Sequence, residues 1–167
     1  MISLKTPISD EQISGLKIND KIEISGKIFA GRDAVLPKIV KLIENGTWDE
    51  KGIALKGGVI FHTAVSPAGI GPTSSNKVEI ESSIPILSSA GVKIHLGKAS
   101  LSAETVEELK KHNSIFCVTP PVSALFGENI VSKKIAAFSE EGMEALWELE
   151  VKGIPAFVAI AKGETIF

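Results

Sequence analysis

The chain has 167 residues, of which 44% are hydrophobic and 23% charged, a balance that excludes a disordered chain and allows one globular domain with a real core. Its 18 Lys and Arg against 20 Asp and Glu leave a net charge of -2, so no broad basic surface for nucleic acid or an anionic membrane is expected. The longest apolar stretch, Ile154–Ala161, has eight residues and contains Pro155, whereas a membrane span needs about 20. With no signal-peptide pattern, we expect the chain in the cytoplasm.

The first half of the chain predicts strands that alternate with helices. Isoleucines at 22, 24 and 28 alternate with polar residues and predict a strand, after which Asp33 is expected to cap a helix that ends near Asn45-Gly46. The apolar run 58–64 predicts a buried strand. A loop rich in Pro and Gly, 66–77, then leads into a helix that reaches Leu87 and stops at Gly91, and residues 92–96 predict the next strand.

The second half is dominated by strands. Ser102 is expected to cap the clearest helix, which has Val106 and Leu109 on its apolar face. A brief helix is expected around 140–145, and four strands are predicted at 115–119, 130–138, 146–151 and 156–161. Because the later strands are close enough in sequence to pair as antiparallel neighbours, residues 1–167 predict a single α/β domain with a mixed sheet.

Cysteine and histidine usage argues against a metal site in this chain. Cys117 is the only cysteine, which excludes an internal disulfide and any all-cysteine cluster site built from this chain alone. It lies in an apolar run, so we interpret it as a buried structural thiol. The three histidines, His62, His95 and His112, lack a short metal-binding spacing.

Three glycine-flanked turns, each just after a predicted strand, form the candidate site: 30–33, 69–77 and 96–100. Glycine lets the backbone approach a ligand, and in the first two turns a following helix N-terminus adds N–H donors. The cations Arg32, Lys77 and Lys98 together suit a small dicarboxylate or a phosphate. Taken alone, Arg32 is better explained by a turn with a capped helix and a solvated arginine, and Lys98 by a solvated charge at a strand end. The central loop lacks the Gly-Lys-Ser/Thr ending of a phosphate-binding P-loop.

Four motifs, in this order along the chain, resemble a known family: Gly31-Arg32-Asp33-Ala34, Gly71-Pro72-Thr73-Ser74-Ser75-Asn76-Lys77, Gly97-Lys98, and Trp147-Glu148-Leu149-Glu150-Val151 followed by Ile154-Pro155-Ala156-Phe157. From about residue 5 onward, the chain resembles the β subunit of class I fumarate hydratase and L-tartrate dehydratase, which is the C-terminal domain in single-chain relatives. The resemblance implies a swivelling β/β/α domain docked on a larger α subunit. Three cysteines of that partner would hold a 4Fe-4S cluster with one open iron.

The resemblance also implies a reaction. It is that of a hydro-lyase, the reversible addition and removal of water on a 2-hydroxydicarboxylate, with malate and fumarate ahead of tartrate, and it would require the α subunit. Arg32 and Lys98 match residues that hold substrate carboxylates, and Thr73 matches the threonine proposed as the catalytic base, which would need nearby cations to favour its alkoxide. Supporting positions are Asp33, Gly31, Gly71, Ser74 and Gly97.

Two positions depart from the family pattern. Leu36 stands where many relatives have a histidine, and Lys77 stands where a second substrate-binding arginine is usual. Lysine keeps the positive charge but loses the two-pronged grip on a carboxylate, so substrate preference is open. Other readings also stay open: a non-catalytic small-anion-binding module that regulates a partner enzyme, and a weakly supported free-standing enzyme for phosphate substrates.

Overall fold

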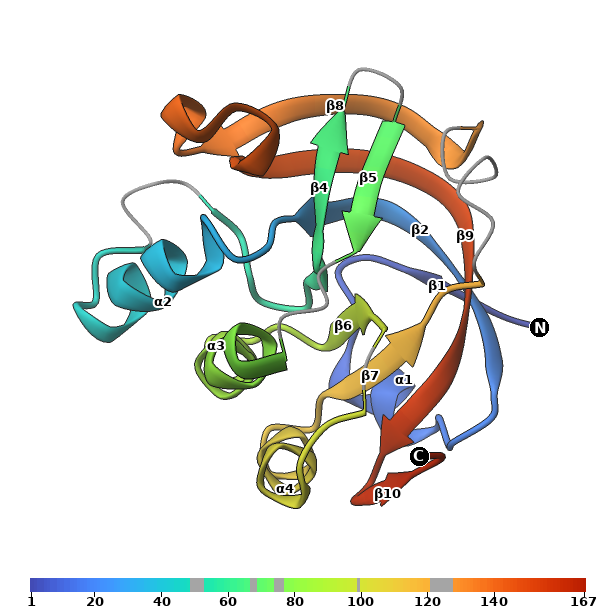
Figure 1. Ribbon diagram of the computed structural model, residues 1–167. Helices are drawn as coiled ribbons and strands as arrows, with labels where there is room; N and C mark the ends of the chain where they lie inside the picture. The colour runs from blue at the N-terminus through green and yellow to red at the C-terminus, as the bar shows by residue number, and fades with distance from the viewer. Residues whose placement is uncertain (49–52, 67–68, 74–76, 99, 121–127) are drawn as a thin grey trace.

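A closed ring of strands forms the centre of the computed structural model, which describes residues 1–48, 53–66, 69–73, 77–98, 100–120 and 128–167. Parallel strands follow one another in the order β1 (Ile2–Lys5), β2 (Lys21–Ala30), β3 (Val59–Phe61), β6 (Ile94–Gly97) and β7 (Ile115–Val118). The long strand β9 (Leu146–Ala161) runs antiparallel to both β7 and β2, so β2, β3, β6, β7 and β9 close into a barrel (Figure 1). The predicted α/β class with a mixed sheet is confirmed.

Strand β9 is continuous where the sequence predicted two strands with a break. It has 16 residues and passes through Gly153, which adopts a positive φ, and Pro155, which pairs with Glu23. The register with β2 shifts between Ile24 and Gly26, where two residues of β9 lie opposite one residue of β2, as in a β-bulge. Buried side chains lie on both sides of the interruption, so both halves of β9 belong to one core-facing strand.

The remaining late elements flank β9. Strand β8 (Ile130–Ala137) pairs antiparallel with its first half, and β10 (Glu164–Thr165) pairs antiparallel with its last residues. The predicted antiparallel pairing of late strands is confirmed. A 3-10 helix, η2 (Ser139–Glu144), connects β8 to β9 at the place where a brief helix was expected.

Helices α2 (Leu36–Glu44), α3 (Lys77–Ser89) and α4 (Ala103–Lys111) lie together on one side of the barrel (Figure 1), while the short α1 (Asp10–Ser14) connects β1 to β2. The Ser102 cap is confirmed, since its side chain accepts a hydrogen bond from the Thr105 amide. One core cluster fills the barrel, and two more pack α2, α3 and α4 against it. Within the described residues, no helix is both long and apolar enough to cross a bilayer.

The start of α2 differs from the prediction. Asp33 does not cap this helix: the capping position is Val35, with no side-chain hydrogen bond, and the helix begins at Leu36. The Arg32 carbonyl accepts from the amides of Val35 and Leu36, so residues 32–35 form a separate turn. Pro37 fits in the first turn of the helix, where its missing N–H is not needed, and it favours this later start.

The run 58–64 and the following loop also differ from the prediction. The run divides between β3 and β4 (Thr63–Ser66), and the predicted loop contains β5 (Gly69–Thr73), which pairs antiparallel with β4 in a separate two-stranded sheet. Gly-Pro sequences usually argue against a strand, but a two-stranded sheet leaves each strand one edge at which proline's missing N–H is not needed.

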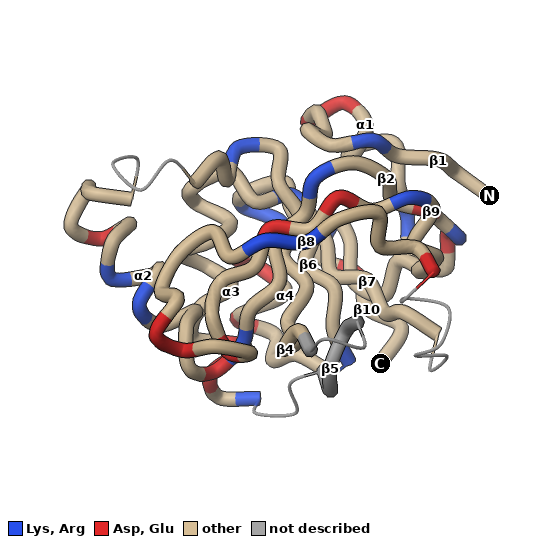
Figure 2. The backbone as a smooth tube through the Cα atoms, turned by 90° about the horizontal axis from the view of Figure 1, so that it is seen from above, with Lys and Arg blue, Asp and Glu red and all other residues tan. Residues whose placement is uncertain are grey.

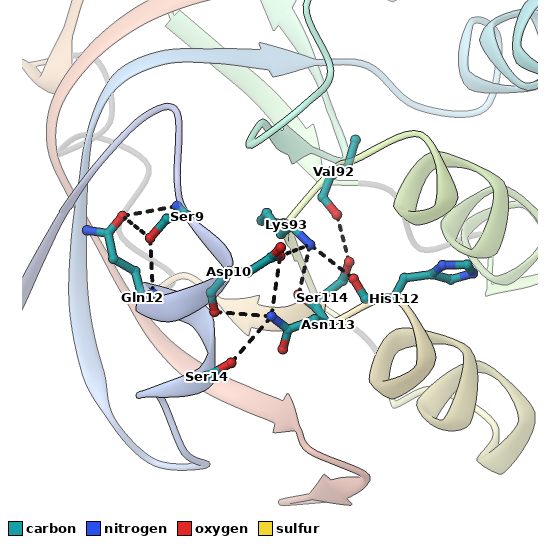
Figure 3. A network of polar contacts seen from close by, with 9 residues as sticks. All are labelled: Ser9, Asp10, Gln12, Ser14, Val92, Lys93, His112, Asn113 and Ser114. Carbon is teal, nitrogen blue, oxygen red and sulfur yellow. Dashed lines mark hydrogen bonds and ion pairs between the residues drawn. The ribbon is translucent and has the colours of Figure 1, made fainter.

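A polar network fastens α1 at the amino ends of β6 and β7 (Figure 3). Lys93 Nζ lies 2.5 Å from a carboxylate oxygen of Asp10 and donates to the carbonyls of His112 and Asn113. The Asn113 amide donates to the Asp10 carbonyl at 3.1 Å, and Ser114 donates to the Val92 carbonyl. These contacts lie at the edge of the parallel strands opposite to their carboxyl ends.

Candidate functional site

The carboxyl ends of neighbouring parallel strands place the candidate residues at one edge of the barrel. Strands β2, β3 and β6 are adjacent and parallel, and Arg32, His62 and Lys98 follow their ends closely. Ligands in open α/β folds usually bind at this edge, because the loops after the strands meet there. The chain therefore gathers at least three polar side-chain positions from distant parts of the sequence.

Arg32 is held by a carboxylate that the sequence did not indicate. Its Nε lies 2.8 and 3.0 Å from the two carboxylate oxygens of Glu144, and its Nη2 lies 2.5 Å from Oε1. Both side chains are less than one-third exposed, at 28% and 29%. Hydrogen bonding to Glu144 raises the pKa of Arg32 against the opposing effect of burial, so the cation is fixed in charge and in direction.

The turn that carries Arg32 is rigidly built. The Gly31 amide donates to the Phe61 carbonyl at 3.0 Å, which joins the turn to the end of β3. A Cβ on Gly31 would lie 2.7 Å from Cγ1 of Val35, so this close approach requires glycine. Asp33 is exposed in the same turn. Gly31 therefore fixes the position of the Arg32 turn by backbone packing.

A second ion pair fixes η2, the element that carries Glu144. Lys38 Nζ of α2 lies 2.6 Å from Glu141 and 3.8 Å from Glu140. The hydrogen bond to Glu141 raises the pKa of Lys38. Two cations from 32–38 thus bind carboxylates of one short helix, which holds η2 beside the start of α2. Elsewhere, blue and red segments are interspersed along the described chain (Figure 2).

A narrow crevice runs between the Arg32 turn and the first turns of α3. Its polar lining comes from Arg32, Asp33, His62 and Glu79, and its apolar lining from Leu36, Pro37 and Ile80. His62 is fully buried. The crevice therefore brings Arg32, predicted from the sequence, next to a histidine and a carboxylate that the sequence did not single out.

The other predicted residues are placed less closely. Lys98 is exposed just after β6, which ends at the buried Gly97, and Lys77 is exposed at the first position of α3. Gly71 and Thr73 belong to β5, and the backbone of Thr73 pairs with Thr63, directly after His62. The Thr73 side chain and all of Ser74 lie outside the described part of the chain. The convergence of the three cations on the Thr73 hydroxyl therefore stays a prediction.

A buried chain of hydrogen bonds leads inward from the crevice. Nε2 of His62 lies 3.1 Å from Nδ1 of His95, and Nε2 of His95 lies 2.9 Å from the Ser88 hydroxyl. Burial lowers the pKa of His62 to about 4, and burial together with the neighbouring His62 lowers the pKa of His95 well below its ordinary value. Both rings are therefore neutral at physiological pH. A histidine inside an apolar strand run was the available signal in the sequence.

The described residues do not fit a metal or cluster site. Among them, no group of three or more His, Cys, Asp or Glu side chains is arranged to hold a metal ion. Cys117 is buried in the barrel core, which confirms the expected structural thiol, and burial raises the pKa of this thiol. The thiolate is the form that ligates iron, so Cys117 is poorly suited to that task.

Comparisons with known proteins agree with the motifs quoted above. The family model described as "Fumarase C-terminus" matches residues 1–167. The chain is 28% identical over 179 residues to "Fumarate hydratase class I, anaerobic" of Escherichia coli (strain K12), covering 99% of this chain and 32% of that protein. It is 26% identical over 169 residues to "L(+)-tartrate dehydratase subunit beta" of Shigella sonnei, covering 94% of this chain and 81% of that protein.

A third relative, "Putative L(+)-tartrate dehydratase subunit beta" of Methanocaldococcus jannaschii, is 25% identical over 177 residues and is covered over 88% of its length. The chain thus spans about a third of the length of the fumarate hydratases it matches, 32% in the first case, and most of the length of the tartrate dehydratase β subunits. With a family model matched from its first residue to its last, the chain belongs to the fumarase C-terminal family, homologous to class I fumarate hydratases and tartrate dehydratase β subunits.

Proposed function

We propose that this chain is the β subunit of a two-subunit hydro-lyase that adds water to, and removes water from, a 2-hydroxydicarboxylate. The observation that carries the proposal is the full-length family match together with Arg32 and Lys98 at the carboxyl ends of β2 and β6, the two strands that flank β3. Cations at such positions suit the carboxylates of a small substrate. Residues 1–167 would act as one domain that swivels on a larger α subunit. The cytoplasmic location expected from the sequence stays a prediction.

The residues of this chain would bind and orient the substrate. Arg32 and Lys98 would each hold a carboxylate, and Lys77 would add positive charge at the start of α3. Thr73, as its alkoxide, would take a proton from the carbon next to the hydroxyl-bearing carbon, and the electron pair of that C–H bond would form the C=C bond. The hydroxide would leave and take up one proton to become water, which balances the proton removed from carbon. The 4Fe-4S cluster is assigned to the α subunit, where it would supply a Lewis acid for the substrate carboxylate and the departing hydroxyl. Cys117 and the other described residues provide no place for it here.

The proposed substrate order is malate and fumarate first and tartrate second. Lys77 provides the charge of the usual second arginine without its planar pair of donors, so the substrate would be gripped less rigidly at that end. The relatives include proteins named for fumarate and for tartrate, and the identity to each is similar. Activity assays on both substrates, rather than the fold, decide between them.

Reconstitution tests the proposal. The purified chain is mixed anaerobically with a cluster-loaded α subunit, and dehydration of L-malate and L-tartrate is measured against each subunit alone. We expect turnover from the mixture only. Arg32→Ala should lower kcat/KM by about 100-fold, in the range of a lost charge-assisted contact to substrate. Lys134→Ala, on the exposed strand β8, is the matched control and should keep the wild-type rate.

Two results would remove the proposal. One is an assembled, cluster-loaded pair that acts on none of the hydroxy acids. The other is a pair of observations: an anionic metabolite binds tightly to the isolated chain, and the enzyme assembled with Thr73→Ala turns over at the wild-type rate. This result would favour the regulatory anion-binding module.

A further inference from the structure

His62 presents a buried, unpartnered nitrogen at the candidate site. Its side chain is 0% exposed, as is that of His95, and Ser88 is 3% exposed. Among the described residues, Nδ1 of His62 is the buried side-chain nitrogen or oxygen that has no hydrogen-bond partner. Its other ring nitrogen is bound to His95, so the free nitrogen lies at the end of the Ser88–His95–His62 chain. A buried polar atom without a partner is costly and needs an explanation.

The hydrogen-bond balance assigns the proton positions. Both rings are neutral, so each carries one proton. If the Ser88 hydroxyl donates to His95, then His95 donates through Nδ1 to Nε2 of His62, and His62 carries its proton on Nδ1. The opposite arrangement leaves the Ser88 proton without an acceptor and Nδ1 of His62 without a donor. The first arrangement leaves fewer polar groups unsatisfied, so His62 ends the chain with an N–H donor.

The surroundings of His62 indicate what this donor meets. The crevice that His62 lines also contains Arg32, and the carboxylates of Asp33 and Glu79. Neither carboxylate accepts the His62 proton, and each has interactions of its own. An anionic oxygen brought in near the Arg32 guanidinium would accept the buried N–H of His62 and be attracted by the positive charge.

We propose that His62 is a further substrate-binding residue, whose Nδ1–H donates to a carboxylate oxygen of the bound hydroxydicarboxylate, and that His95 and Ser88 are positioning residues that keep the proton on Nδ1. This inference rests on the proposed function, because that function supplies the carboxylate. The crevice has no room for a water molecule in the present arrangement. Substrate entry therefore requires the side chains that line the crevice to move apart next to His62.

Two amide substitutions test the roles of the two ring nitrogens of His62 separately. In His62→Asn, the amide N–H is placed near the position of Nδ1 but does not reach His95. In His62→Gln, the amide reaches toward His95 but provides no donor at the position of Nδ1. With the assembled enzyme and L-malate, His62→Gln should raise KM by about tenfold, as expected for one lost hydrogen bond to a charged group, with a smaller change in kcat. His62→Asn should recover most of that loss.

His112→Gln is the matched control, since His112 lies at the end of α4 and pairs with Glu108 at 3.5 Å. Its KM should equal that of the wild type. Nitrogen-15 NMR of the isolated, histidine-labelled chain gives a readout that needs no partner: we expect the proton of His62 on Nδ1 and its loss from that position in Ser88→Ala. Circular dichroism of each variant checks that it is folded.

Three outcomes would overturn the inference. A proton found on Nε2 of His62, equal KM values for His62→Gln and the wild type, or a larger defect in His62→Asn than in His62→Gln would each do so. If the wild-type assembly dehydrates malate and these results appear, the proposed function stands and the role of His62 falls. If the wild-type assembly acts on no hydroxy acid, the proposed function falls first, while the NMR result still judges the proton position.

Discussion

The pair of Arg32 and Glu144 joins the candidate site to the rest of the fold, and breaking it has a calculable cost. In Glu144→Gln, the carboxylate that accepts from Nε and Nη2 is replaced by an amide with one acceptor oxygen. Fully exposed ion pairs contribute about 0.2–1 kcal/mol, and hydrogen bonds to charged groups contribute about 1.5–3 kcal/mol. Because both side chains are 28–29% exposed, we place this pair between these ranges, at about 1–2 kcal/mol.

The assay is a double-mutant cycle on thermal unfolding. Glu144→Gln, Arg32→Gln and the double variant are compared with the wild type, and the loss of about 1 kcal/mol in the single variant corresponds to a Tm lower by about 2–4 °C for a chain of this size. Glu140→Gln is the control, since Glu140 lies on the same helix with its side chain 62% exposed. It should change Tm by less than about 1 °C.

The coupling energy from the cycle shows whether Arg32 and Glu144 stabilise the fold as a pair. Independent sites add within about 0.3–0.5 kcal/mol, so a coupling of about 1 kcal/mol or more shows that Glu144 and Arg32 act as a pair. A coupling inside that limit would refute the reasoning, since it would mean that the two side chains do not hold each other in solution. Added salt should weaken the coupling only slightly, because the pair is partly buried.

Two further predictions concern other parts of the molecule. Hydrogen bonding to Lys93 and Asn113 lowers the pKa of Asp10 below its ordinary value of 3.8, so the stabilisation from Asp10 is present above that value and is lost as pH falls through the lower folded-state pKa. Asp10→Asn should therefore lower Tm at pH 7, and its difference from the wild type should shrink as pH falls below 3.8. A difference that stays constant with pH would contradict this assignment. Cys117, buried with a raised thiol pKa, should not react with a thiol reagent in the native chain and should react fully in guanidinium chloride, and rapid labelling of the native chain would contradict its place in the core.

Local patterns predicted most of the elements. Alternating isoleucines in β2, the Ser102 cap of α4 and the apolar run around Cys117 each determine structure through the nearest neighbours in the chain, and each was confirmed. The misplaced boundaries share a cause. Asp33 fits a helix cap by residue type, but the observed turn depends on Gly31 bonding to Phe61, a contact between distant segments.

Likewise, some residues of the candidate site were predicted from local sequence patterns and others were not. Arg32 and Lys98 were found from glycine-flanked turns, because such turns mark strand ends that bind ligands. Glu144 was missed because it comes next to Arg32 only when β9 pairs with β2, with Ala30 opposite Trp147. The bond between His62 and His95 was missed for a similar reason, since it requires β3 and β6 to be parallel neighbours.

By itself, the sequence determined most of the strands and helices, the cations available for an anion, and the family, because residue type, periodicity and ordered motifs are properties of the chain. Tertiary structure decided that the strands close into a barrel, that Arg32 is held by Glu144, and that His62 is buried with one nitrogen unpaired. These depend on register and burial, which are set by the packing of distant segments and change protonation and hydrogen-bond balance without any mark in the local sequence.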